Sequence, residues 1–279
     1  MLFAQSKNDA IAIYDKAVKK YNRYYEQLQE RGNQLYQTRR DSVSLIQDVE
    51  SLVNSIANSP KEFEKKLVAI HREREKFREV EEYAKESLSA EIQSGVSVAA
   101  SVGAGTAFAA MAPSAAMWVA TTYGIASTGT PIALLHGAIQ TQAALAWLGG
   151  GALSAGGAGI VGGKALLALA GPIGWGISGT AMAASAFALG HKNKQIADEA
   201  IEEAKKVTIA GAGLNEDSAK IQALTDKTSR LLSNQRYAFR KLPVRHGADY
   251  RSLSEDVQYQ LGALVNNTLS LAELLNQTI

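Results

Sequence analysis

Few side chains in this sequence have the spacing of a catalytic or ligand-binding motif. Residues 157–162 read Gly-Ala-Gly-Ile-Val-Gly, which matches the glycine fingerprint of dinucleotide-binding turns. That fingerprint normally follows a β-strand, and no strand pattern precedes it here; the next acidic residue is Asp198. Residues 162–165 are similar to a phosphate-binding loop, but Ala165 replaces the hydroxyl that would hold magnesium. We interpret both as chance matches within a glycine-dense segment.

The residue types needed for metal binding and nucleophilic catalysis are also scarce. The chain has no cysteine, and its histidines, His71, His136, His191 and His246, are scattered. His71 and Glu75 share a helix face, but two ligands without a third make an incomplete metal site. No hydrolase or kinase signature is present. We therefore expect no enzyme activity, no cofactor, no metal and no small-molecule substrate.

The distribution of charge divides the chain into three blocks. Residues 92–190, the neutral block, contain a single charged side chain, Lys164. The flank 1–91 carries 16 basic and 16 acidic residues, and the flank 191–279 carries 12 and 11. A nucleic-acid-binding protein requires a basic excess, so we expect no nucleic-acid partner, although balanced totals leave open a local basic face. The first residues, Met1 to Lys7, lack the long apolar core of a signal peptide.

Hydrophobic periodicity predicts that both flanks are long amphipathic helices. Apolar residues of the first helix recur at spacings of three and four, as in a heptad seam. The seam consists of Tyr14, Val18, Tyr21, Tyr25, Leu28, Leu35, Ile46, Val49, Val53 and Ile56, with polar Arg39 and Ser42 between its two halves. A break is expected at Asn58-Ser59-Pro60, before a charge-rich second helix.

The C-terminal flank is predicted to contain further helices separated by two breaks. Gly211-Ala212-Gly213 predicts a hinge, and Pro243 predicts the end of the following helix. Ser252 with Glu255 forms a capping box for a last helix. The buried face of that helix would contain Val257, Leu261, Leu264, Leu271 and Leu275, interrupted by Thr268. No convincing strand pattern occurs anywhere.

The neutral block is long enough for several membrane spans of about 20 residues each. Expected breaks lie at Pro113, at the turn 127–131, at 149–151 and at Gly171-Pro172, giving segments near 92–126, 132–149, 152–170 and 173–190. The block is rich in alanine and glycine, which add little to insertion, whereas leucine-type residues contribute roughly −0.3 to −0.6 kcal/mol each. Insertion should therefore be marginal, which suits a segment that is stored against protein and released later.

Small residues and aromatic residues are the candidate site of this block. Gly151, Ala155, Gly159 and Gly163 recur every fourth residue, a ridge that drives close helix packing in lipid. Lys164 is an ionisable group at membrane depth and thus a candidate pore-lining or partner-contacting residue. Trp118, Trp147 and Trp175 lie near segment ends, where indole rings act as interfacial anchors. The same features fit small residues and aromatic side chains packed inside a soluble bundle.

Two resemblances support a membrane role. Residues 123–130 (Tyr-Gly-Ile-Ala-Ser-Thr-Gly-Thr) and 146–159 (Ala-Trp-Leu-Gly-Gly-Gly-Ala-Leu-Ser-Ala-Gly-Gly-Ala-Gly) resemble a glycine-zipper segment of bacterial membrane-associated proteins. Pro131 and His136 depart from the small or polar residues expected there. By its layout of long helical flanks around a hydrophobic centre, the chain also resembles the alpha-helical pore-forming toxins of the cytolysin A type. That resemblance implies a hydrophobic head that refolds into the membrane and oligomerises.

The sequence thus predicts an all-α protein with long helical bundle or coiled-coil flanks, 1–91 and 191–279, around a membrane-inserting region, 92–190. The leading hypothesis is a toxin or defence effector that inserts into a lipid bilayer, as a homo-oligomer or with a second subunit, from a soluble pre-insertion form. An alternative is a constitutive membrane protein whose flanks scaffold a partner. A third is a soluble helical interaction protein with a buried Gly/Ala hairpin.

Overall fold

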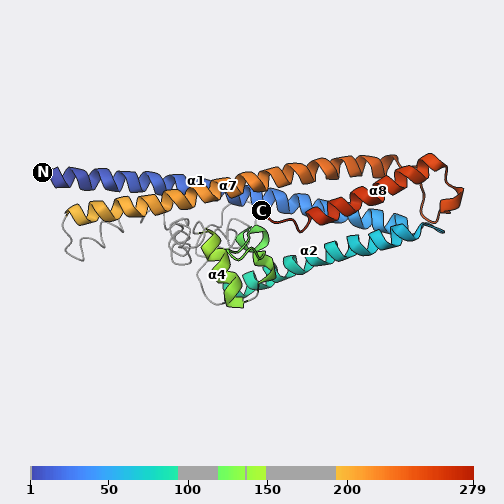
Figure 1. The fold of residues 1–279 in the computed structure, drawn as a ribbon, viewed down its shortest axis with the longest axis horizontal. Coiled ribbons are helices and arrows are strands. Elements are labelled where there is room, and N and C mark those ends of the chain that lie inside the picture. Colours follow the sequence, from blue (N-terminus) through green and yellow to red (C-terminus); the bar gives the residue numbers. More distant parts are fainter. Residues whose placement is uncertain (1, 94–118, 136, 149–192) are drawn as a thin grey trace. The chain divides into compact units, whose positions relative to one another are not determined.

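The computed structural model describes residues 2–93, 119–135, 137–148 and 193–279 (Figure 1). These residues form helices and no strand, with two isolated β-bridges, so the all-α prediction is confirmed for the described part of the chain. The α-helices are α1 (Leu2–Asn54), α2 (Lys61–Gln93), α4 (Gly137–Leu148), α7 (Asn193–Lys241) and α8 (Glu255–Leu274). Short 3₁₀ helices are η2 (Ile132–Leu134) and η4 (Tyr250–Ser252).

The chain divides into two compact units, and both flanks contribute to each of them. Unit 1 comprises Met1–Gly32, Ser87–Lys220 and Thr278–Ile279. Unit 2 comprises Asn33–Glu86 and Ile221–Gln277.

In unit 1, large side chains of α1 face small side chains of α7. The predicted seam residues Tyr14, Val18, Tyr21, Tyr25 and Leu28 are all buried. The buried face of α7 has the same three-and-four spacing but is mostly alanine: Ala197, Ala200, Ala204, Val207, Ala210 and Leu214. Pairing large residues with small ones lets two helices interdigitate without voids.

The predicted hinge at Gly211 is wrong, because α7 continues unbroken through this position. A Cβ on Gly211 would lie 3.4 Å from Cδ2 of Tyr24 and 3.6 Å from Cα of Tyr21. The glycine thus lies where α7 approaches the tyrosines of α1 closely. Glycine costs a helix about 1 kcal/mol relative to alanine, and tertiary packing overrides so weak a preference.

Unit 2 is built from the second part of α1, the first part of α2, the last part of α7 and all of α8. The seam of α1 continues as predicted, with Leu35, Ile46, Val49 and Val53 buried, as is Ile56 just after the helix ends. Phe63, Ile70 and Phe77 of α2 are also buried. On the predicted face of α8, Leu261, Leu264 and Leu271 are buried, as is Leu275 just after the helix, whereas Val257 is only partly buried. These apolar faces together form the core of the unit.

Several polar groups inside unit 2 are held by specific hydrogen bonds. The amide of Gln235 on α7 donates to the carbonyl of Leu264 at 2.9 Å and to the hydroxyl of Thr268 at 2.8 Å. The guanidinium of Arg39, which is almost fully buried, donates to the carbonyl of Gln277 at 2.5 Å. The buried stripe of α1 therefore continues through Arg39, because this side chain is buried like the apolar seam residues before and after it.

The helix ends of unit 2 meet in a pair of joined turns. The break at Asn58-Ser59-Pro60 is confirmed, because α1 ends at Asn54 and α2 begins at Lys61. Asn58 has a positive φ of 57°, and its side-chain amide donates to Asp249 at 3.0 Å. Backbone bonds between Ala57 and residues 248 and 250 complete the contact, at 2.9 Å each. One side-chain hydrogen bond and two backbone hydrogen bonds thus join the two turns.

The start of α8 differs from the predicted capping box. Ser252 belongs to η4, and the N-cap of α8 is Ser254, whose hydroxyl accepts a hydrogen bond from the amide of Val257 at 3.4 Å. Asp249 caps η4 by accepting from the amide of Arg251 at 2.9 Å. Two consecutive caps therefore form where the spacing Ser-x-x-Glu indicated one.

Candidate membrane-contacting site

The described part of the neutral block, residues 119–135 and 137–148, lies in unit 1 and carries no charged side chain. Residues 119–123 are helical, and the chain then reverses between Gly124 and Ile132. The amide of Ala126 donates to Thr130 at 2.8 Å, and that of Ile132 donates to Gly124 at 3.0 Å. Gly129 has a φ of 81°, which favours glycine. The predicted turn at 127–131 is confirmed.

This segment docks on α1 at Gly32. Val119 and Tyr123 are buried, and the hydroxyl of Tyr123 donates to the carbonyl of Gly32 at 3.4 Å. A Cβ on Gly32 would lie 2.6 Å from Cγ2 of Val119, closer than real side chains pack. The backbone amide of Ile279 donates to the carbonyl of Tyr123 at 3.0 Å. The start of the described neutral segment is thus held from two sides within unit 1.

The following helix, α4, buries a polar side chain and exposes an apolar one. Gln140 is only 4% exposed and donates to the carbonyl of Ile132 at 3.2 Å. Its neighbour Ile139 is 65% exposed, as is Leu134 at the end of η2. Ile125, in the preceding turn, is exposed as well. Thr141 and Gln142 of α4 are exposed and Ala144 is buried, as is usual for a water-exposed helix, so Ile139 and Gln140 are the two exceptions.

Of the predicted interfacial anchors, Trp147 is the one within the described residues. It lies in α4 and is partly exposed, and its Cδ1 would lie 3.3 Å from a Cβ on Gly124. Trp118 and Trp175 lie outside the described residues, as do the ridge positions Gly151, Ala155, Gly159 and Gly163 and the charge of Lys164. The residues that sequence reasoning missed are Leu134 and Ile139, which have no periodic partners to mark them.

The helix lengths bear on the predicted spans. The crossing predicted for residues 132–149 is interrupted, because η2 ends at Leu134 and α4 starts at Gly137. With 12 residues, α4 is about 18 Å long, against about 30 Å for a hydrocarbon core. Among the described residues, no helix has both the length and the apolar character that crossing a bilayer requires.

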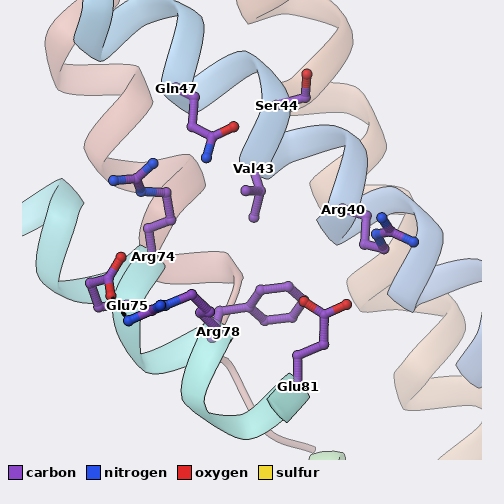
Figure 2. A pocket seen from close by; sticks show the side chains of 9 residues that line it. Arg40, Val43, Ser44, Gln47, Arg74, Glu75, Arg78 and Glu81 are labelled. Carbon is purple, nitrogen blue, oxygen red and sulfur yellow. Dashed lines mark ion pairs between the residues drawn. The ribbon is translucent and has the colours of Figure 1, made fainter. Parts of the chain in front are cut away.

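Unit 2 contains a groove between α1 and α2, with a volume of about 340 Å³ (Figure 2). Arg78 pairs with Glu75 at 2.5 Å, and Arg74 lies 3.4 Å from Glu50. The groove is lined by Arg40, Val43, Ser44, Gln47, Arg74, Glu75, Phe77, Arg78 and Glu81. The pair of Arg78 lies within α2, whereas Arg74 with Glu50 and Glu81 with Tyr36 join α2 to α1. We therefore interpret the groove as part of the contact between these two helices.

The pKa values of two residues at this contact between α1 and α2 are shifted. Burial raises the pKa of Tyr36 to about 12, and its hydrogen bond to Glu81 acts in the same direction. Burial also raises the pKa of Glu50, although Arg74 and His71 oppose the shift. His71 itself contacts Arg74 at 2.9 Å. Within the described ranges no three His, Asp or Glu side chains are grouped as metal ligands would be.

Comparison with known proteins gives no relative for this chain. No protein-family model matches it, and neither a curated protein nor a solved structure does.

Proposed function

We propose that the protein acts on lipid bilayers by inserting its neutral block, and that several copies assemble to permeabilise the membrane. The observation that carries this proposal is the exposure of two large apolar side chains of the uncharged segment, Leu134 and Ile139, each 65% exposed. The described residues then represent a stored form, from which the neutral block is released on contact with lipid.

Energetics favour such a release at this helix. An exposed isoleucine or leucine gains nothing from folding here, yet each gains free energy on entering a bilayer, roughly −0.3 to −0.6 kcal/mol on the insertion scale. The neutral segment 119–148 has no charge that would oppose the transfer. Crossing would require α4 to extend beyond its 12 residues. Small residues beyond Leu148 supply a ridge for the helix association that assembly needs.

The test is release of a dye trapped in vesicles after addition of protein purified without detergent. Three chains are compared: the native chain, Leu134→Gln with Ile139→Gln, and the control Ile13→Gln with Val68→Gln. The control removes two apolar side chains that are also exposed, 53% and 71%, but lie on α1 and α2. We expect release by the native chain and by the control, and loss of release in the α4 variant.

Folding is checked by thermal melts, since exposed substitutions should change stability by no more than about 0.5 kcal/mol. Equal release by all three folded proteins would show that α4 does not contact lipid. Absence of release by the native chain would reject permeabilisation. Residence of the native chain in membranes from synthesis onward would then support the alternative, a constitutive membrane protein whose flanks scaffold a partner.

A further inference from the structure

The last part of α7 and the loop after it form a basic stretch, residues 227–248, in unit 2. It contains no acidic residue and six basic ones: Lys227, Arg230, Arg236, Arg240, Lys241 and Arg245. All of them are exposed except Arg236, which is partly buried. The overall balance of charge in the C-terminal flank hides this local excess.

The cations of the basic stretch differ from the lysines earlier on the same helix. Lys205 and Lys206 each contact a glutamate at 2.7 Å, and Lys220 contacts Glu216 at 3.0 Å. Among the described residues, no cation of the basic stretch forms an ion pair. The nearby carboxylate of Asp249 is occupied by Asn58 and by the amide of Arg251. The six cations of the stretch are therefore held in no ion pair within the described part of the chain, and the nearest carboxylates in the sequence, Asp226 and Asp249, lie just outside its two ends.

An exposed aromatic side chain lies within this charge. Tyr237 is 67% exposed, and Nζ of Lys241 lies 6.0 Å from the centre of its ring. Arg230, Tyr237 and Lys241 recur at helical spacing and share one face of α7. A tyrosine among cations is typical of a surface that contacts the headgroup region of a membrane.

Helix stability accounts for only part of this pattern. Arg240 and Lys241 lie in the last turn of α7, where cations favour the negative end of the helix dipole. That effect falls off within one turn, so it does not account for Arg230 or Arg236. Nor does it account for Arg245, which lies beyond the helix.

We infer that the basic stretch of α7 is a docking surface for an anionic lipid surface, with Tyr237 entering the headgroup region. This inference deepens the proposed membrane function and rests on it. Clusters of basic residues attract anionic lipid headgroups, each by about 1 kcal/mol near the surface. Binding of single-stranded nucleic acid fits less well, because it requires several stacking aromatic residues in a positively charged groove. Here one exposed tyrosine lies on a helix face.

The experiment measures binding of the full chain to vesicles of phosphatidylcholine, with and without phosphatidylglycerol. The test variant is Arg240→Gln with Lys241→Gln and Arg245→Gln. The matched control is Lys205→Gln with Lys206→Gln and Lys220→Gln, which removes the same charge from ion-paired positions of the same helix. We expect roughly 100-fold weaker binding to anionic vesicles in the test variant, from about 1 kcal/mol per cation.

The control should bind as the native chain does, and raising salt from about 0.1 M to about 1 M should abolish native binding. Equal loss in both variants would overturn the inference, since net charge alone would then decide binding. Tighter binding to an oligonucleotide, lost in the same test variant, would also overturn it.

Dye release from the same vesicles separates the two proposals. Binding without release would reject permeabilisation alone, whereas undiminished binding and release in the folded test variant would reject the docking surface alone.

Discussion

Gly32 of α1 and Val119 of the neutral block lie so close that a Cβ on the glycine would be 2.6 Å from Cγ2 of the valine. The same glycine supplies the carbonyl that accepts the hydroxyl of Tyr123 at 3.4 Å. One small residue in a long amphipathic helix thus provides the docking point for an uncharged segment. The strength of that contact should control how readily the segment leaves α1.

Gly32→Ala should loosen residues 119–124 from α1. Alanine favours the helix by about 1 kcal/mol, but its methyl group collides with Val119, so the segment must shift. Hydrogen exchange of the peptide around Tyr123 should accelerate. The control is Gly262→Ala on α8, where a Cβ meets nothing within 4 Å. That change should raise the Tm by roughly 2–4 °C and leave exchange near Tyr123 unchanged. Unaltered exchange in Gly32→Ala would contradict the docking role.

The Gln235–Thr268 hydrogen bond should make two substitutions in unit 2 non-additive. Thr268→Val removes the acceptor 2.8 Å from the amide of Gln235 and should cost about 1 kcal/mol in urea unfolding. Once Gln235→Leu has removed the donor, Thr268→Val should cost less, with a coupling of roughly 0.5 kcal/mol or more. Thr225→Val is the control, because the hydroxyl of Thr225 bonds to Ile221 of its own helix. Coupling of Gln235 to Thr225 as strong as that to Thr268 would refute this assignment.

The raised pKa of Glu50 predicts a pH-dependent effect of Glu50→Gln. Because burial raises this pKa in the folded state, the folded protein favours the protonated carboxyl. The stability that the protonated carboxyl of Glu50 contributes is complete below the pKa of glutamate in the unfolded chain, about 4.3. It is lost as the pH rises through the higher pKa of Glu50 in the folded protein. Replacement by uncharged glutamine should therefore be more favourable, or less unfavourable, at pH 7 than at pH 4. Melting temperatures at both pH values test this.

Glu64→Gln is the matched control, since Glu64 is an exposed residue of α2. Its effect on the melting temperature should differ little between the two pH values. If Glu50→Gln lowers the melting temperature more at pH 7 than at pH 4, the ion pair with Arg74 outweighs the burial of the carboxylate, and folding lowers the pKa of Glu50 instead of raising it.

The small-residue ridge predicts loss of assembly when its middle is filled. Gly159→Leu with Gly163→Leu places two bulky side chains where close helix approach in lipid is expected. Dye release should fall at least tenfold, while binding to vesicles persists. Gly157→Leu is the control, because position 157 lies on the other side of an α-helix from Gly159. Release unaffected by the double substitution would remove the ridge from the proposed assembly.

Much of the helical framework could be predicted from periodicity alone. Spacings of three and four identified the buried stripe of α1 from Tyr14 to Val53, and Pro60 marked the break before α2. These signals are local, because a helix repeats every 3.6 residues and proline cannot continue it. The turn at 127–131 could be predicted in the same way, because the residue types around Gly129 favour a turn with glycine at a positive φ.

Only the tertiary structure decided the environment of residues whose neighbours in space are distant in the sequence. Gly211 by its type predicts a break in α7, but packing against Tyr21 and Tyr24 keeps the helix whole. Arg39 interrupts the apolar stripe of the sequence, yet the carbonyl of Gln277, 238 residues away, makes its burial tolerable. In the same way Gln140 is buried beside exposed Ile139 because the carbonyl of Ile132 accepts its amide. A pattern of residue types gives hydrophobicity and spacing, whereas a hydrogen-bond partner supplied by another part of the chain exists only after folding.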